Sequence, residues 1–133
     1  MERLFIADTH AVIWYLTADD RLGQNAKTIM HRSDNQIAVP AIVVAESLYI
    51  IEHGKSPATT IQLWDFVLQS SNVSFCPLDV SVLKESETLI IIPEMHDRQI
   101  VATALSLQDS NTESIIITKD RNITNSGLIK TVW

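Results

Sequence analysis

Four acidic residues stand where carboxylates are costly or could do chemistry. Asp8 ends the apolar run "LFIA", and Asp120 follows "SIIIT". Asp97 opens "DRQIVATAL" after "IIIPEMH", and Glu46 interrupts "AIVVAESLYII". A carboxylate among apolar neighbours is unfavourable unless it is paired or bound to a metal. Two carboxylates roughly 4 Å apart repel by about 4 kcal/mol at an effective dielectric of 20, and a cation would remove that cost.

The available ligand types favour a hard divalent cation. Cys76 is the only cysteine, and the four histidines show no paired metal-ligand spacing. The ligand set is therefore oxygen-only, which suits Mg²⁺ or Mn²⁺. Such a site binds phosphate oxygens, orients water and stabilises the charge that develops in an in-line displacement.

Each acid also has an ordinary structural explanation. Asp8 and Asp97 could be helix N-caps, and Asp120 could be a turn residue in "TKDRN". Glu46 could be half of a buried ion pair, with Arg98 as its partner. The combination favours function, because independent features of the sequence place all four acids at one edge of the expected fold.

Strands and helices alternate along the chain, and this alternation would bring the acids together. We expect strands at residues 3–7, 36–40, 73–78 and 114–120, and a short fifth strand within 127–133. We expect helices at 10–17, 25–32, 41–53, 58–70, 80–89 and 97–108. Continuous apolar strands of this kind predict an α/β fold with a parallel sheet covered on both faces. Ligands of such sheets bind beyond the carboxyl ends of the strands, where Asp8 and Asp120 belong.

Several residues mark the expected helix ends. Pro40 suits the first turn of the helix that carries Glu46, and Gly54 suits its end. Ser56 and Pro57 suit the N-cap and first position of the next helix. Asp79 could cap the helix at 80–89.

The bulk properties fit one soluble domain over residues 1–133. The net charge of −6 argues against broad wrapping of nucleic acid but leaves room for a local site. No apolar run is long enough for a membrane span, and the N-terminus lacks a signal-peptide pattern, so we expect no membrane association. A single cysteine is simplest to explain in the cytoplasm.

Five segments carry a family resemblance across nearly the whole chain. They are "FIADTHAVIWYL", "VPAIVVAESLYI", "IPEMHDRQIVATAL", "IIITKDRNI" and "TVW". In this order they resemble a PIN-domain ribonuclease, and most closely the VapC-like toxins of type II toxin–antitoxin modules. The resemblance implies a three-layer PIN-like fold with sheet order 3-2-1-4-5. It also implies metal-dependent endonucleolytic cleavage of RNA, control by a cognate antitoxin, and a homodimer.

The resemblance makes Asp8, Glu46 and Asp97 the core acids and Asp120 a more variable fourth. Our hypothesis is that Asp8 and Asp97 hold the metal and that Glu46 positions a metal-bound water. Asp120 would complete the shell or hold a second, weaker ion. The water would attack the phosphodiester and leave 5′-phosphate and 3′-hydroxyl ends.

Other residues are expected to support the site. Thr118 and Thr9 would do so by hydrogen bonding. Arg98, Lys119 and Arg121 could hold flanking phosphates, although ordinary surface charge explains Arg121 at least as well. We expect packing or hydrogen-bonding roles for His10 and His96, and core positions for Trp14, Tyr15 and Trp64. The least buried of these three aromatic residues could instead contact a dimer mate or the antitoxin.

Three alternatives remain open at this point. A receiver-like phosphoacceptor module shares edge acids and Mg²⁺, but it would normally have adjacent acids after the first strand. A catalytically inactive binding domain of the same fold is weakened by the complete acid set. An RNA-processing or DNA-directed nuclease without an antitoxin keeps the chemistry and changes the biology. The resemblance makes tRNA or rRNA a plausible substrate without choosing between them.

Overall fold

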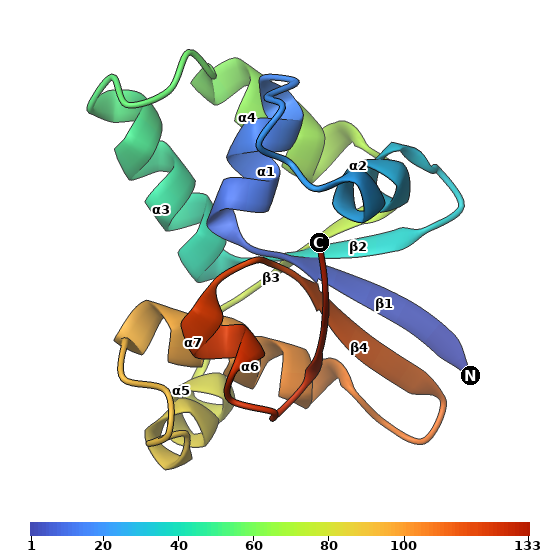
Figure 1. The fold of residues 1–133 in the computed structure, drawn as a ribbon, viewed down its shortest axis with the longest axis vertical. Helices are drawn as coiled ribbons and strands as arrows, with labels where there is room; N and C mark the ends of the chain where they lie inside the picture. Colours follow the sequence, from blue (N-terminus) through green and yellow to red (C-terminus); the bar gives the residue numbers. More distant parts are fainter.

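A parallel sheet of five strands runs through the middle of the computed structural model, which describes residues 1–133 (Figure 1). The strands are β1 (Glu2–Ala7), β2 (Gln36–Pro40), β3 (Val73–Cys76), β4 (Thr112–Ile117) and β5 (Lys130–Val132). Their order is β3-β2-β1-β4-β5, which confirms the expected α/β class and the order 3-2-1-4-5. Flavodoxin-like folds such as that of CheY have the order 2-1-3-4-5, so the receiver-like alternative is wrong.

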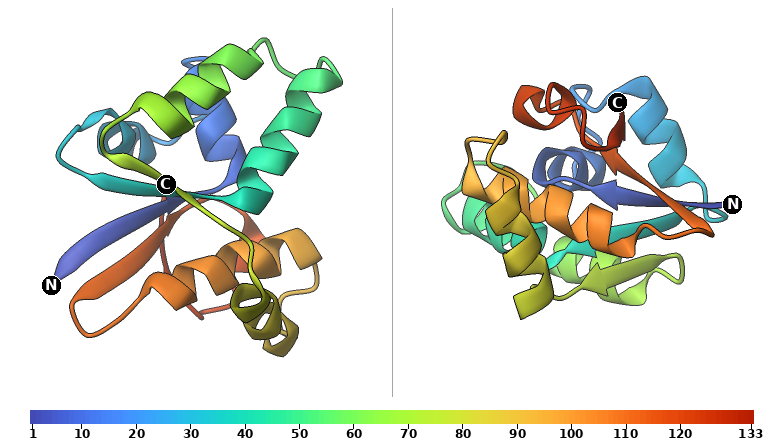
Figure 2. Two further views of the ribbon diagram at one scale, coloured as in Figure 1. Left: turned by 180° about the vertical axis from the view of Figure 1, so that it is seen from behind. Right: turned by 90° about the horizontal axis from the view of Figure 1, so that it is seen from below.

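Two layers of helices cover the sheet, as expected. One layer holds α1 (Thr9–Leu16), α2 (Gln24–His31), α3 (Ala41–Glu52) and α4 (Thr60–Gln69). The other holds α5 (Val80–Thr88) and α6 (Met95–Leu107), and the left view of Figure 2 shows the same two layers from behind. The short helix α7 (Arg121–Thr124) joins β4 to β5. None of these helices has the length and apolar character needed to cross a membrane.

The centre of the sheet is buried because β1 has a neighbour on each side. Ile6 pairs with Ala38 of β2 and with Ile116 of β4, and all three are fully buried. One cluster of 30 buried apolar residues forms the core around them. Ala7 of β1 lies opposite Ile117 of β4, so the residues that follow these two strands leave the sheet side by side.

The start of α4 differs from the sequence-based expectation. The Ser56 and Pro57 assignment is wrong, because α4 begins at Thr60 with Thr59 as its N-cap. The Thr59 hydroxyl accepts from the N–H of Gln62, and the Gln62 side chain accepts from the N–H of Thr59. This capping box satisfies two N–H groups reciprocally, whereas the Ser56 hydroxyl accepts only from the N–H of Ala58.

Two other helix starts are shifted, and two expected boundaries are confirmed. Pro40 is the last residue of β2 and the N-cap of α3, so it precedes the first turn instead of lying in it. The helix α6 begins at Met95, two residues before Asp97. Gly54 follows α3 with a φ of +65°, a conformation that glycine adopts without strain. The Asp79 side chain caps α5 by accepting from the N–H of Val82.

Candidate active site

The four acids singled out in the sequence all lie at the carboxyl edge of the sheet. Asp8 directly follows β1 and is the N-cap of α1, and Asp120 comes three residues after the end of β4 and is the N-cap of α7. Glu46 lies in the second turn of α3, and Asp97 lies in the first turn of α6. The beginnings of these four helices meet at the left of the sheet in Figure 1. The structure therefore brings the acids of four separate segments to one place.

Asp8 is buried and held by two hydrogen bonds. It is 6% exposed, and its carboxylate accepts from the Thr118 hydroxyl and, at 2.9 Å, from the N–H of Ala11. Burial raises the pKa of Asp8, and these two hydrogen bonds oppose the rise. Asp8 is thus an N-cap, as its structural explanation proposed, and it also faces the shared edge. The Thr118 hydroxyl accepts from the N–H of Asp120 at 3.0 Å, so Thr118 links two of the acids.

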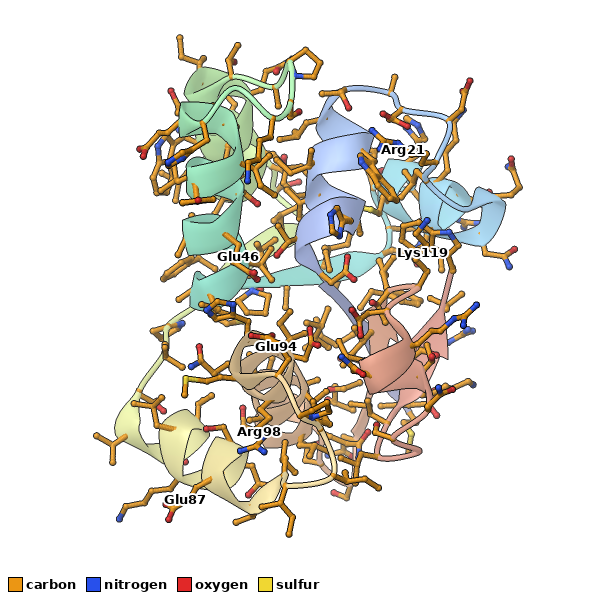
Figure 3. The ribbon with its side chains drawn as sticks, turned by 60° about the vertical axis from the view of Figure 1, so that its left-hand side comes forward. Arg21, Glu46, Glu87, Glu94, Arg98 and Lys119 are labelled. Atoms are coloured by element: carbon orange, nitrogen blue, oxygen red, sulfur yellow. The ribbon has the colours of Figure 1, made fainter.

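Glu46 is half-buried and oriented by its neighbours. Its Oε1 accepts from the Thr9 hydroxyl at 2.9 Å, which supports the expected role of Thr9. Its Oε2 lies 3.4 Å from Nδ1 of His96. The proposed ion pair between Glu46 and Arg98 is wrong. Arg98 Nε donates to the carbonyl oxygen of Ile92 at 2.5 Å, and Figure 3 shows Arg98 below Glu94, toward α5.

Asp97 carries the clearest electrostatic signal of the edge. Burial and repulsion by Asp120, Glu94 and Glu46 raise its pKa to about 6. Only a long hydrogen bond of 3.5 Å from Asn122 Nδ2 opposes this rise. Because repulsion falls off with distance, the contributions of these three acids mean that they lie near Asp97.

Glu94 was missed in the sequence, and His96 has one of the two roles expected for it. The N-cap interpretation of Asp97 is wrong, because Glu94 is the N-cap of α6. Glu94 accepts from the N–H of Asp97 at 2.9 Å and adds a fifth carboxylate to the edge. His96 Nδ1 lies 3.3 Å from Glu94 and 3.4 Å from Glu46, so it lies between two acids, in line with the hydrogen-bonding role expected for it. Figure 3 shows Glu46 and Glu94 on facing elements. The spacing of Glu94 three residues before Asp97 fits an N-cap, but glutamate is a poor N-cap and the signal is weak.

The donor set of the edge fits a hard divalent cation in its chemistry. Carboxylate and hydroxyl oxygens dominate it, and their repulsion is unrelieved by any Lys or Arg ion pair. No three His, Cys, Asp or Glu side chains are arranged as a ready-made ligand group, so the acids are neighbours without converging on one point. The residues that would hold a cation are Asp8, Glu46, Asp97 and Asp120.

The aromatic residues are placed unevenly. Trp14 is buried at 7% exposure, as expected, and Tyr15 is half-buried against the rings of His31 and Phe66. Trp64 is 40% exposed, so its assignment to the core is wrong. Its exposure follows from its position on the outer side of α4, whose Leu63 and Phe66 face the core instead.

Comparisons with known proteins agree with the fold. The sequence matches the family model of the PIN domain over residues 5–126. No curated protein matches it. The fold is similar to that in a structure of VapBC2 from Rickettsia felis bound to a DNA fragment from their promoter, with a TM-score of 0.65, 14% identity and 97% of each chain covered.

Two further solved structures are similar. For VapBC-1 from nontypeable Haemophilus influenzae the TM-score is 0.63 at 14% identity, with 97% of this chain and 96% of that chain covered. For the T. brucei RRP44 PIN domain the TM-score is 0.56 at 9% identity, with 98% of this chain and 76% of that chain covered. At these identities the likeness concerns the fold.

Proposed function

Because the chain belongs to the PIN-domain family, whose members are in general nucleases, we propose that it is a divalent-metal-dependent endoribonuclease and the toxin of a toxin–antitoxin pair. The observation that carries the nuclease assignment is Asp97. Its pKa of about 6 reflects burial and then repulsion by carboxylates from α3, the start of α6 and the start of α7. A fold gains no stability from such repulsion, so a functional reason for it is favoured.

Each residue of the site would have a separate role in hydrolysis. Thr118 and the N–H of Ala11 fix the Asp8 carboxylate, and Thr9 fixes one oxygen of Glu46. The second oxygen of Glu46 has only His96 beside it and can orient the attacking water or accept its proton. A bound Mg²⁺ or Mn²⁺ would neutralise the acids, hold phosphate oxygens and acidify water. Hydrolysis would break the bond between phosphorus and the 3′ oxygen and leave a 5′-phosphate.

The toxin assignment has separate support. Two of the solved structures that share this fold are of VapBC proteins from two bacteria. We therefore propose a cognate antitoxin as the partner, a homodimer as the assembly, and the cytoplasm as the place of action. Structured RNA such as tRNA or rRNA is the expected substrate class.

Cleavage of a 5′-labelled structured RNA by the purified chain tests the nuclease assignment. We expect cleavage with Mn²⁺ or Mg²⁺, none with EDTA, and products that carry 5′-phosphate and 3′-hydroxyl ends. Asp97→Asn should abolish cleavage, and Asp65→Asn on the exposed surface of α4 should not. Cleavage by the Asp97→Asn protein at the wild-type rate would refute the site.

Expression in a bacterial host tests the toxin assignment. The wild-type chain should arrest growth, and Asp97→Ala should be tolerated at the same level of folded protein. Equal toxicity of the two would exclude the catalytic explanation. If neither is toxic while the purified wild-type chain cleaves RNA, the protein is a PIN nuclease that acts without an antitoxin.

A further inference from the structure

Beside the acids lies a cluster of cations and aromatic rings, here called the Trp14 cluster: Trp14, Trp133, Lys119, Arg21 and His10. Lys119 Nζ lies 4.8 Å from the ring centroid of Trp14 and 5.9 Å from that of Trp133. Arg21 lies 4.7 Å from the Trp14 centroid, and the His10 ring lies 5.0 Å from it. Cations at these distances are attracted by the ring face, so the two tryptophans hold Lys119 in place.

The platform under Lys119 is built by packing. Trp133 meets Trp14 edge to face at 5.8 Å. A Cβ on Gly23 would lie 2.5 Å from Cδ1 of Trp133, so this glycine leaves the space that the ring occupies. Trp14 itself is only 7% exposed, so it supports the cations and offers little face for stacking a base.

The charge of Lys119 is free to meet a ligand. Lys119 is exposed, and no ion pair of the structure includes it. Arg21 differs, because it forms a bidentate pair with Asp19 at 2.8 and 3.0 Å. Lys119 is therefore the ordered and uncompensated cation of the Trp14 cluster.

The Trp14 cluster adjoins the acids through the chain itself. Lys119 stands between Thr118, which donates to Asp8, and Asp120. His10 follows Thr9, which donates to Glu46. Figure 3 shows Lys119 near Arg21 on one side of α1, with Glu46 on the other. A strand whose scissile phosphate lies at the acids would therefore place a neighbouring phosphate at Lys119.

A groove continues from the Trp14 cluster along α1. It has a volume of about 180 Å³, and its lining includes Trp14, Lys55, and Arg21 with its partner Asp19. Lys119 lies beside this groove, on the other side of Arg21 and the Trp14 ring, and does not line it. Lys55 Nζ lies 5.2 Å from the centroid of the Tyr49 ring, so a second lysine is placed over an aromatic side chain at the far end. The eight residues of α1 extend over about 12 Å. Phosphates of one strand of duplex DNA recur about every 3.4 Å along the axis, and even at twice that spacing this length accommodates more than one.

We propose that Lys119, held by Trp14 and Trp133, binds a backbone phosphate next to the scissile one, and that the α1 groove leads the RNA strand from the acids toward Lys55. This inference rests on the proposed ribonuclease function. It makes Lys119 a positioning residue that acts through phosphate contact and reads no base. The net charge of −6 makes such a local cation important, because the rest of the surface repels RNA on average.

Binding of a fluorescein-labelled single-stranded RNA, followed by anisotropy in EDTA over a series of NaCl concentrations, tests the proposal. Lys119→Gln should weaken binding at every salt concentration. It should also make the fall of log K with log salt less steep by about 0.7, the value for one phosphate contact on a single strand. Lys84→Gln, on the exposed side of α5 in the other helix layer, is the matched control and should leave both unchanged. Trp133→Leu keeps every charge, so it should weaken binding with little change in slope.

The outcomes separate this proposal from the one it rests on. If Lys119→Gln and Lys84→Gln have the same effect while the wild type binds and cleaves RNA, the Lys119 proposal is overturned and the ribonuclease stands. If the wild type neither binds nor cleaves RNA, both are overturned. A poly-glutamate peptide provides a third arm. Loss of peptide binding in Lys119→Gln with unchanged RNA binding would make the Trp14 cluster a protein-docking surface and also overturn the proposal.

Discussion

Replacing Asp97 by asparagine should stabilise the metal-free protein at neutral pH, although it abolishes activity. In the folded chain, burial and the neighbouring acids raise the pKa of Asp97 from 3.8 to about 6. A raised acid pKa means that the folded state resists ionisation of the group. The resulting cost is absent below pH 4, grows as the pH rises from about 4 to 6, and is fully present above that. Asparagine mimics the neutral acid and escapes the cost.

The size of the effect follows from the shift. About 2 pKa units at about 1.4 kcal/mol each set an upper bound of roughly 3 kcal/mol. Asp97 is only half-buried, so solvent screening reduces this by about half. Its charge near the N-terminus of α6 is favourable by about 0.5 kcal/mol, which asparagine loses. We therefore expect Asp97→Asn to raise the free energy of unfolding at pH 7 by about 1 kcal/mol.

Urea unfolding in EDTA at several pH values between 4 and 8 measures this difference. The gain should be largest at pH 7 to 8 and should vanish near pH 4, where wild-type Asp97 is already protonated. Asp65→Asn, which removes a charge from the exposed surface of α4, should show no such pH dependence. A constant difference across the pH range, or a loss of stability at pH 7, would refute the account of repelling acids.

Three further changes probe the same edge. Mg²⁺ or Mn²⁺ should raise the melting temperature of the wild type, and Asp8→Asn should lose most of that increase; an unchanged wild-type melting curve at saturating metal would contradict a shared carboxylate site. Glu46→Gln should leave the metal-free free energy of unfolding within about 0.5 kcal/mol and reduce RNA cleavage sharply, whereas a loss of about 3–5 kcal/mol with activity intact would give Glu46 a structural role. Thr118→Val should lower the free energy of unfolding, measured by thermal unfolding, by about 1–3 kcal/mol, because buried Asp8 loses its hydroxyl donor. Thr118→Ser keeps the hydroxyl and should retain most of the wild-type stability.

The backbone arrangement could be predicted from the sequence because it depends on long patterns. Continuous apolar strands alternating with helices indicate a covered parallel sheet, and the resemblance gives its order. The placement of Asp8 and Asp120 at one edge follows from their positions after strands. The start of α4 could not be predicted, because Ser56 and Thr59 are both suitable N-cap residues. In the structure the capping box with Gln62 makes Thr59 the N-cap.

Side-chain partners were harder to predict than side-chain positions. Arg98 is one residue from Asp97 and carries the charge that Glu46 would need, yet the direction of its side chain on α6 takes it to the carbonyl of Ile92. His96 lies within reach of both Glu46 and Glu94 because α3 and α6 begin at the same edge. Sequence spacing says nothing about distances between elements that are about 50 residues apart, so these contacts could not be predicted from the sequence.

The hydrogen bonds of the edge distinguish Asp97 from the other acids. Asp8 accepts from Thr118 and Ala11, and Glu46 accepts from Thr9. Asp120 accepts from two N–H groups of α7, at 2.8 and 3.3 Å. Asp97 has only the contact of 3.5 Å with Asn122. The other three acids thus accept hydrogen bonds from nearby donors of the chain, whereas most lone pairs of Asp97 have no hydrogen-bond donor. Because a carboxylate without hydrogen-bond donors gains most from a cation, a bound cation should change the environment of Asp97 more than that of the other three acids.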